Sequence, residues 1–347
     1  MRSKTLLLAA ALVLTAAPAL EAQTEITARG ADIRIGGRLH GQFTTSSVDG
    51  ANSQFAFRRA RLNIDVSVGD FWSARVQPDF VGGTATLQDA WVRFNFDPAF
   101  RVSVGQFQRA FDIFEASSST ELSIIERDGR IGGYSNCAGV GGVCTLSRFA
   151  PKLEFAGRDQ GVRVEAGSGR LRFLGTLTNG TGVNTADENS SKSFGGRLTY
   201  AATEKLKVGG GIALHDYDDA GETEYATGWS AELEYGDFAE EGLHLQAGVI
   251  GGENWKVTDS PTFMAWQAVA TWYAPLNGDR IVGIEPVARI GSGDPNTAVD
   301  DDGGLAFTPG LMFYVSGRNK FGFNVDFYSP QTGDTEYSFK FQTYVYF

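Results

Sequence analysis

Apolar and polar side chains alternate residue by residue in many segments of this chain. In the last segment, YSFKFQTYVYF, the side chains on one side of the backbone are mostly apolar: Tyr337, Phe339, Phe341, Thr343, Val345 and Phe347. The side chains between them are mostly polar. Since side chains of a strand alternate between two faces, one face of this segment suits lipid and the other suits a wet interior. The pattern predicts a strand of a transmembrane barrel.

Segments with this period of two, bounded by Gly, Pro, Asp or Asn, predict sixteen strands. They span 31–43, 55–68, 71–81, 85–96, 100–108, 158–166, 170–179, 193–201, 205–215, 224–236, 242–252, 263–274, 280–291, 305–316, 320–328 and 336–347. Every second link is tight, as at 69–70 and 316–320, and the links between them are mostly longer. Outer-membrane barrels alternate short periplasmic turns with longer extracellular loops in this way. We therefore predict an all-β fold, a transmembrane antiparallel β-barrel of about 16 strands with both termini on the periplasmic side.

One link is far longer than the others and runs from 109 to 157, after the fifth strand. A segment of that size without regular structure is usually functional or disordered. The stretch STELSIIERD within it has the capping residues and acids of a short helix. We expect this loop to fold into the lumen and constrict it, as the comparable loop of general porins does. An extracellular flap that merely covers the mouth of the barrel is the alternative.

The amino terminus predicts export. Two basic residues, Arg2 and Lys4, precede an apolar run over 6–17 that small residues follow. This pattern is typical of a secretory signal peptide, so we expect residues 1–22 to be cleaved off and 23–347 to form the barrel in a Gram-negative outer membrane. An uncleaved anchor helix is the alternative, but the run is shorter than the ~20 residues needed to span a bilayer.

Composition narrows the class of protein. No later segment has 18 uninterrupted apolar residues, and the mean hydropathy is slightly polar at −0.17, which excludes a helical bundle in the membrane. Gly is abundant (44 residues) and aromatic residues reach 12%, as expected of many strands joined by turns. No Pro-rich or Ser-rich linker divides the chain, so we expect one barrel domain.

The two cysteines, Cys137 and Cys144, lie in the Gly-rich stretch NCAGVGGVCT of the long loop. Export to an oxidising compartment and the six flexible residues between them make a local disulfide feasible. Metal binding is the alternative, but two thiols with no nearby His make an incomplete zinc set. We favour the disulfide and expect no metal site.

Arginines gather on the inward face of the first five strands. In the strand 55–68, every second residue from Ala60 to Val68 is apolar, so Arg59 and Arg61 point into the lumen. The same phasing in the five strands gives seven inward arginines, which are Arg34, Arg38, Arg59, Arg61, Arg75, Arg93 and Arg101. They can bind and orient solutes, or they can be structural partners of inward acids: Asp65, Asp79 and Asp89.

The charge is unevenly distributed along the chain. Residues 23–178 hold 18 basic and 16 acidic side chains, whereas 179–347 hold 10 and 24. We expect a relatively basic amino-terminal wall, an acidic remainder and a transverse field across the pore. Many of the acids fall in predicted loops at 215–224 and 293–304. Asp300, Asp301 and Asp302 of the second loop could bind calcium, but their spacing does not match an EF-hand loop, and a solvated acidic loop is the alternative that we favour.

Catalytic motifs do not emerge from the sequence. The chain has three His and lacks both an HExxH zinc motif and a GxSxG nucleophile elbow, so we expect no enzyme and no cofactor. It also lacks a Gly-rich phosphate loop and a basic nucleic-acid patch.

Several segments resemble the phosphate-selective porin O and P family. They are GGRLHGQF at 36–43, FRRARLNIDVSVGDFWSARVQPDF at 57–80, LQDAWVRFNF at 87–96 and RVSVGQFQRAFDIFEASSSTELSIIERD at 101–128. A final strand that ends in Phe347 also resembles the recognition signal of bacterial outer-membrane barrels. The resemblance implies a sixteen-stranded trimeric channel that passes anions along an arginine ladder. It assigns Arg127 to that ladder through the loop element Glu126–Arg127.

The sequence therefore favours an outer-membrane porin that forms a water-filled channel for small polar solutes, with an anion or phosphate preference. The expected partners are outer-membrane lipids, small inorganic anions or polar solutes, and two further copies of the chain. A general or cation-preferring pore and a structural or adhesive barrel remain the alternatives.

Overall fold

The computed structural model describes residues 24–28, 30–187 and 189–347, and the predicted signal peptide lies outside the described residues. Its elements, in chain order, are β1 (Thr24–Ala28), β2 (Ala31–Ser46), β3 (Gln54–Val68), β4 (Trp72–Asp79), β5 (Thr86–Asp97), β6 (Phe100–Gln108), α1 (Ile113–Ala116), α2 (Leu146–Lys152), β7 (Arg158–Ser168), β8 (Leu171–Thr178), β9 (Ser193–Ala201), β10 (Leu206–Asp219), β11 (Glu222–Tyr235), β12 (Gly242–Glu253), β13 (Thr262–Pro275), β14 (Gly283–Asp294), β15 (Gly304–Ser316), β16 (Asn319–Pro330) and β17 (Glu336–Tyr346). None of the described helices is long and apolar enough to cross a membrane.

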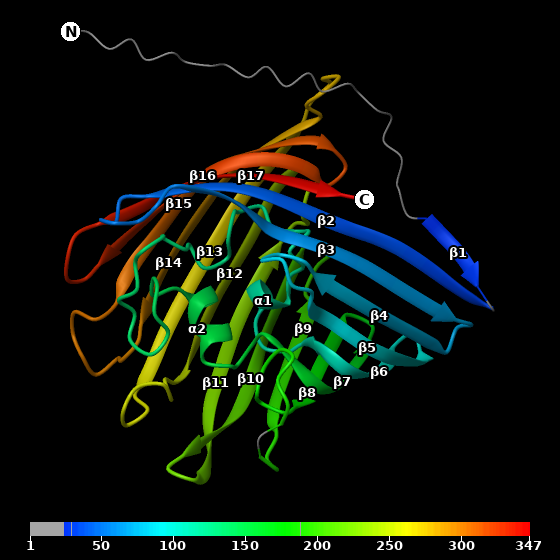
Figure 1. The fold of residues 1–347 in the computed structure, drawn as a ribbon, viewed down its shortest axis with the longest axis horizontal. Helices are drawn as coiled ribbons and strands as arrows, with labels where there is room; N and C mark the ends of the chain where they lie inside the picture. The colour runs from blue at the N-terminus through cyan, green and yellow to red at the C-terminus, as the bar shows by residue number, and fades with distance from the viewer. Residues whose placement is uncertain (1–23, 29, 188) are drawn as a thin grey trace.

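Sixteen strands close into one antiparallel barrel, which confirms the predicted fold. Each strand from β2 to β17 pairs with the next, and β17 pairs with β2 (Figure 1). At this seam the Gly37 amide donates to the Phe347 carbonyl at 2.7 Å. A Cβ added at Gly37 would lie 2.4 Å from the Phe347 ring, so the position has room only for glycine. The short strand β1 forms a hairpin with the start of β2.

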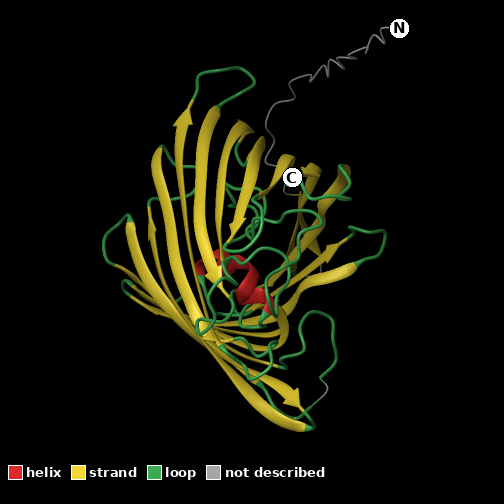
Figure 2. Ribbon diagram, turned by 90° about the vertical axis from the view of Figure 1, so that its left-hand side faces the viewer, coloured by secondary structure: helices red, strands yellow, loops and turns green. Residues whose placement is uncertain are grey.

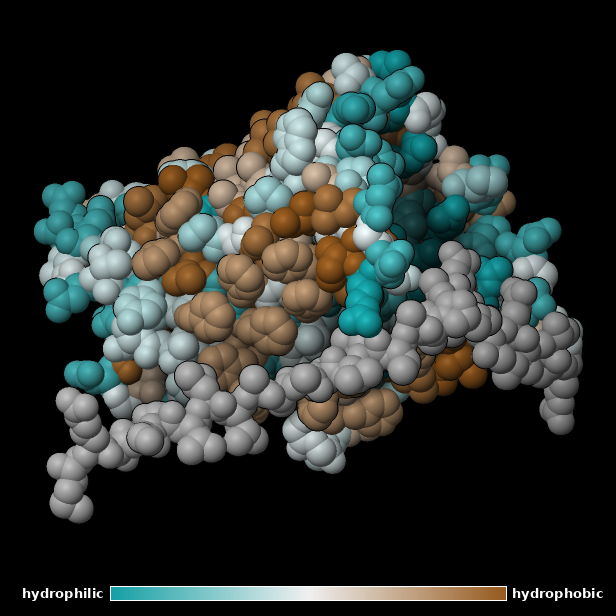
Figure 3. Space-filling model, turned by 90° about the horizontal axis from the view of Figure 1, so that it is seen from above, coloured by the Kyte–Doolittle hydropathy of each residue, from teal (hydrophilic) through white to brown (hydrophobic). Residues whose placement is uncertain are grey.

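The outer surface is apolar, as the alternation requires. From above the view of Figure 1, hydrophobic side chains gather across the middle of the surface and hydrophilic ones at its ends (Figure 3). Aromatic side chains pack together at one rim, where Trp72 contacts Phe94 with ring centroids 4.5 Å apart and Phe71 contacts Phe96 at 5.4 Å. An apolar band flanked by aromatic residues is typical of a barrel in lipid.

The two ends of the barrel differ. At the end called here the turn end, links such as 69–71, 98–99 and 169–170 are very short. At the opposite, loop end, most links are longer. The predicted acidic loop at 215–224 was wrong, because β10 and β11 continue through it to a two-residue turn at 220–221. Both turn residues have positive φ, which suits a tight hairpin, and strands that extend beyond the lipid can be polar on both faces.

The long loop 109–157 lies inside the barrel and carries α1 and α2 (Figure 2). Its apolar side chains form a core against the inward face of the long strands. Phe149 of α2, for example, stacks on Phe263 of β13 with ring centroids 4.9 Å apart, and both are fully buried. Cys137 and Cys144 of the loop are joined by a disulfide. The hydrophobic core therefore fills one side of the lumen.

Candidate functional site

The inner part of the loop is held by polar side chains of β14–β17, called here the docking wall. Arg289 of β14 donates to the backbone carbonyls of Glu126 at 3.1 Å and Arg127 at 2.6 Å, and to the Asp326 carboxylate at 2.7 Å. Lys320 donates to the Leu122 carbonyl at 2.6 Å. These bonds fix the loop across the lumen.

The root of the loop lies on β9 and β10, at positions that require glycine. A Cβ at Gly211 would lie 2.2 Å from the Phe111 carbonyl oxygen, and one at Gly195 would lie 2.6 Å from that of Ala110. Ser230 of β11 also donates to the Phe111 carbonyl at 2.8 Å. The missing side chains let the loop backbone approach the wall closely.

Between the loop and the opposite strands lies a cavity of about 220 Å³, called here the constriction cavity. The loop contributes residues 115–119 to it. Seven arginines line it, which are Arg38, Arg59, Arg61, Arg75, Arg127, Arg158 and Arg163. All but Arg127 come from β2, β3, β4 and β7, which with β5 and β6 form what is called here the arginine wall.

Most arginines of this wall have a carboxylate partner. Arg61 donates to Asp79 at 2.7 Å, and Arg75 donates to Asp65 at 2.6 Å. Arg158 donates to Asp89 at 2.7 Å, and Arg163 lies 3.1 Å from Glu165. These pairs rigidify the wall and neutralise part of its charge, because Glu165 is shared by Arg163, Arg93 and Arg101.

Two arginines differ from the others. Arg38 donates to the Ser119 hydroxyl at 2.5 Å, and no described carboxylate forms an ion pair with it. Arg59 is only 6% exposed and has neither a hydrogen bond nor an ion pair with a described side chain. A buried cation normally has a counter-charge, so these two carry positive charge that no ion pair within the wall balances, and Arg59 interacts only at longer range with Glu126 of the loop.

Of the other predicted arginines, Arg34, Arg93 and Arg101 lie outside the constriction cavity, whereas Arg127 lines it. Arg93 donates to Glu165 at 2.7 Å, and Arg101 lies 3.9 Å from the same carboxylate. Arg34 is exposed near the start of β2. Arg127 turns back into its own loop, where it donates to the Phe114 carbonyl at 2.7 Å.

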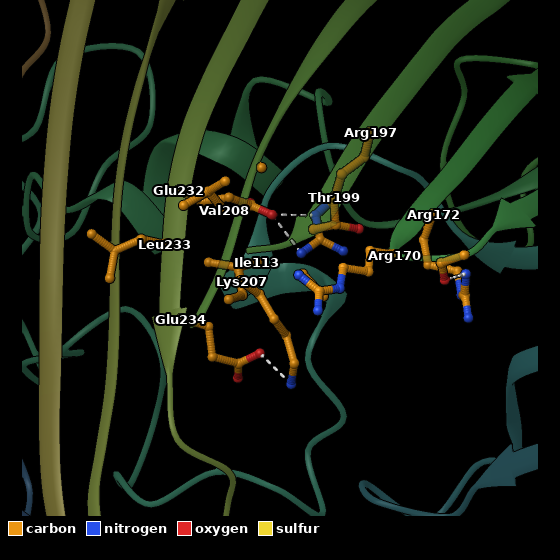
Figure 4. A pocket seen from close by; sticks show the side chains of 13 residues that line it. Ile113, Arg170, Arg172, Arg197, Thr199, Lys207, Val208, Glu232, Leu233 and Glu234 are labelled. Carbon is orange, nitrogen blue, oxygen red and sulfur yellow. Dashed lines mark hydrogen bonds and ion pairs between the residues drawn. The ribbon is translucent and has the colours of Figure 1, made fainter. Parts of the chain in front are cut away.

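A second space lies between Ile113 and the short link 169–170 of the turn end, and Figure 4 shows the side chains that line it. Its volume is about 360 Å³, and Ile113 of α1 lies at its border. Arg197 donates to Glu232 at 2.7 Å and Lys207 to Glu234 at 3.3 Å, as the dashed lines in Figure 4 mark. Several of its lining residues also line an adjacent space of about 610 Å³, so the two are continuous.

Burial and neighbouring charges shift the pKa values of two acids of the loop, Asp112 and Glu126. Asp112 caps α1 by accepting from the Phe114 and Glu115 amides, and burial together with the nearby Glu115 charge raises its pKa to about 7. Burial alone would raise the pKa of Glu126, but Arg58 and Arg59 lower it below its ordinary value. Glu126 is therefore ionised, whereas Asp112 titrates near neutral pH.

Comparison with known proteins identifies the family. The model for phosphate-selective porin O and P matches residues 33–272. The chain belongs to this porin family. No curated protein matches it by sequence. It is an outer-membrane channel and not an enzyme.

Solved porin structures share the fold at low sequence identity. The channel DcaP of Acinetobacter baumannii is 12% identical with a TM-score of 0.63, over 92% of this chain and 99% of that one. OmpT of Vibrio cholerae, in its trimer form, is 10% identical with a TM-score of 0.61, over 92% and 100%. OmpF of Salmonella typhi, in complex with daunomycin, is 12% identical with a TM-score of 0.60, over 93% and 100%.

The sequence did not reveal every polar residue of this porin's lumen. Strict alternation along β3 would point Arg58 outward, because its neighbour Arg59 points inward. A bulge in the β2–β3 register, between His40 and Gly41, turns Arg58 inward as well. It pairs there with Glu126, and its Nη2 lies 2.9 Å from the carboxylate. Only the cross-strand register could have identified this residue.

Trp91 was also missed. It lies between Asp89 and Arg93 on the inward face of β5, where an indole is unexpected. The guanidinium carbon of Arg93 lies 4.5 Å from the ring centroid, and those of Arg75 and Arg163 lie at 5.8 and 5.9 Å. Its inward position was readable from the strand phasing.

Within the part of the chain that the structure describes, no group of three or more His, Cys, Asp or Glu side chains could hold a metal ion.

Proposed function

We propose that this porin prefers anions and conducts them past Arg38 and Arg59 at the constriction cavity. The supporting observation is that these two buried guanidiniums form neither a hydrogen bond nor an ion pair with a described carboxylate, whereas Arg61 and Arg75 do. An unbalanced positive charge at the narrow part of a pore attracts anions and repels cations.

The path of the solute follows the arginine wall and then β8–β11. The loop core and the docking wall fill the other side of the lumen, while the constriction cavity and the two spaces towards the turn end lie along β2–β11. Arg101 and Arg172 line the space of about 610 Å³, so basic side chains accompany the solute beyond the constriction.

The test is the reversal potential of the purified protein in a planar bilayer with a KCl gradient. If the pore prefers anions, its reversal potential is shifted from zero towards the equilibrium potential of chloride. A reversal potential shifted towards the equilibrium potential of potassium would instead favour a cation-preferring pore governed by the acidic loops. Absence of conductance would favour a structural barrel.

We also propose that the porin is a homotrimer whose contact surface includes the short strands β4, β6, β8 and β9. These have 8 or 9 residues, whereas β10–β13 have 12 to 14. Eight residues at about 3.3 Å each, tilted by about 40°, span about 20 Å, less than the apolar band of about 25 Å. A wall too short for lipid is better covered by protein, and the trimer form of the similar OmpT supports this assembly.

Cross-linking and native mass in mild detergent test the trimer. A species of three chains is expected, and a monomer in both measurements would remove the proposal. Export completes the proposed function: we expect cleavage near Ala22, which the amino-terminal sequence of the membrane-inserted protein would report, and contact of the outer face with outer-membrane lipids.

A further inference from the structure

Several polar atoms of the constriction cavity are buried but have no hydrogen-bond partner. They are the Oε1 atom of Gln77, the Nε2 atom of Gln108 and the Nε atoms of Arg38, Arg59 and Arg163. All five residues line this one cavity. Because buried polar groups in proteins are nearly always paired, these atoms are available to bind water or a solute that enters the cavity.

The cavity presents acceptors as well as cations. The Gln77 amide nitrogen donates to Asn63 at 2.5 Å, which fixes the side chain with its oxygen left over as an acceptor. The Glu115 carboxylate also lines the cavity, and its described partner is Arg127 at a distance of 4.0 Å. An anion that carries no donor group could use Arg38 and Arg59 but would leave these acceptors unmatched.

The size of the cavity points in the same direction. Its volume of about 220 Å³ is several times the ~30 Å³ that one water molecule occupies in the liquid. A small inorganic ion would occupy part of it, whereas an anionic group joined to a short chain of carbons fills more of it.

We propose that the constriction cavity selects small hydroxylated organic anions, with the anionic group at Arg38 and Arg59 and hydroxyl groups donating to Gln77 and Glu115. The inference rests on the proposed anion preference and adds the chemical class of the solute. Hydroxyl groups match the acceptors, and the oxyanion matches the two guanidiniums that lack a carboxylate.

The experiment compares two anions that differ in their hydroxyl groups. Threonate and butyrate have the same charge and the same four-carbon skeleton, and each is added to one side of a bilayer that carries a chloride current. Threonate is expected to halve the current at about a ten-fold lower concentration than butyrate, the factor that one to two hydrogen bonds provide. Threitol, which has hydroxyls but no charge, is expected to block weakly.

A matched pair of variants assigns the effect to the cavity. Gln77→Met keeps the size of the side chain and removes the acceptor. It should therefore raise the threonate concentration that halves the current about five-fold and leave that of butyrate unchanged. Gln267→Met is the control, because Gln267 is similarly buried, also has an unpartnered Oε1 and lies on β13 away from the cavity. Gln267→Met should change the block by neither anion.

Equal block by threonate and butyrate in the unmodified porin would overturn the inference, and this comparison needs no variant to fold. An equal loss of threonate affinity in both variants would overturn the assignment to Gln77. The proposed anion preference is tested separately by the reversal potential in KCl alone, so its failure and the failure of this inference can be distinguished.

Discussion

The arginine wall and the docking wall both bring basic side chains into the lumen, but they use them differently. On the docking wall, Arg289 is 1% exposed and its donors bind two loop carbonyls, Thr308 and Asp326. On the arginine wall, Arg59 is nearly as buried and binds no described side chain. The residue type therefore does not decide the role of a lumenal cation. Its partners decide whether it holds the loop or lines the constriction cavity without an ion pair.

The largest effect is expected from the docking wall. Arg289→Met leaves two loop carbonyls and part of the Asp326 carboxylate unpaired, and breaking a buried ion pair costs about 3–5 kcal/mol. We expect the loop to detach, the single-channel conductance to rise and the barrel to unfold at a lower temperature. The exposed Arg280→Met is the control and should match the unmodified porin. Unchanged conductance in Arg289→Met would mean that other contacts suffice to hold the loop.

The next effect concerns selectivity. Arg38→Gln together with Arg59→Gln removes the two unbalanced charges, so the anion-to-cation permeability ratio should fall by roughly three- to five-fold. The matched double variant Arg61→Gln with Asp79→Asn removes an ion pair and leaves the net charge unchanged. It should hold its selectivity. If both double variants behave alike in the reversal-potential measurement, the distinction between paired and unpaired arginines fails.

Trp91 provides a smaller test of the same wall. Its indole faces three guanidiniums and stabilises them without neutralising their charge, by about 0.5–1 kcal/mol per close contact. Trp91→Leu should lower the anion-to-cation permeability ratio by about two-fold, because the arginines lose the indole that orders them. Trp91→Phe keeps an aromatic face, so its ratio should lie close to that of the unmodified porin. Equal ratios in the Leu and Phe variants would assign the residue to packing alone.

The smallest effect is a pH dependence. The pKa of Asp112 is raised to about 7, so the stability that this acid contributes is present at acidic pH and is lost as pH rises through about 7. Lowering the pH from 8 to 6 removes its negative charge beside Glu115 and Glu232, and the anion-to-cation ratio should rise by less than about two-fold. Asp112→Asn should flatten this response. A response that persists in the variant belongs to another titrating group.

Much of the barrel could be predicted because its cause is local. The alternation of side chains along a strand is a property of the backbone, so the positions of β2–β17 and the inward direction of Arg59, Arg61 and Arg75 followed from single segments. The alternation of tight and long links further indicated that these strands close into a barrel. The length of the 109–157 link also indicated a functional loop.

The partners of each arginine could not be predicted in the same way. Arg58 enters the lumen because a bulge shifts the β2–β3 register, which depends on how two strands meet. Arg59 and Arg61 are two residues apart on one face, yet only Arg61 reaches a carboxylate. Arg127 binds its own loop, which depends on how that loop folds.

The expected acidic second wall also differs from the structure. Net charge along residues 179–347 concealed Arg289, Lys320 and Lys340, whose inward positions the strand phasing could have revealed. The loop binds Arg289 and Lys320, and Lys340 pairs with Asp326, so a count of acids and bases did not describe the lumenal surface.

The seam between β17 and β2 has a consequence for how the protein is made. These strands are far apart in the sequence, and Gln42 and Gln342, which bond across the seam, are separated by 300 residues. Joining such distant segments is slow, because the chain must first lose the entropy of a very long loop. Until then both strands are open edges able to pair with other molecules. The nascent chain therefore depends on escort to the membrane, and any delay there favours aggregation.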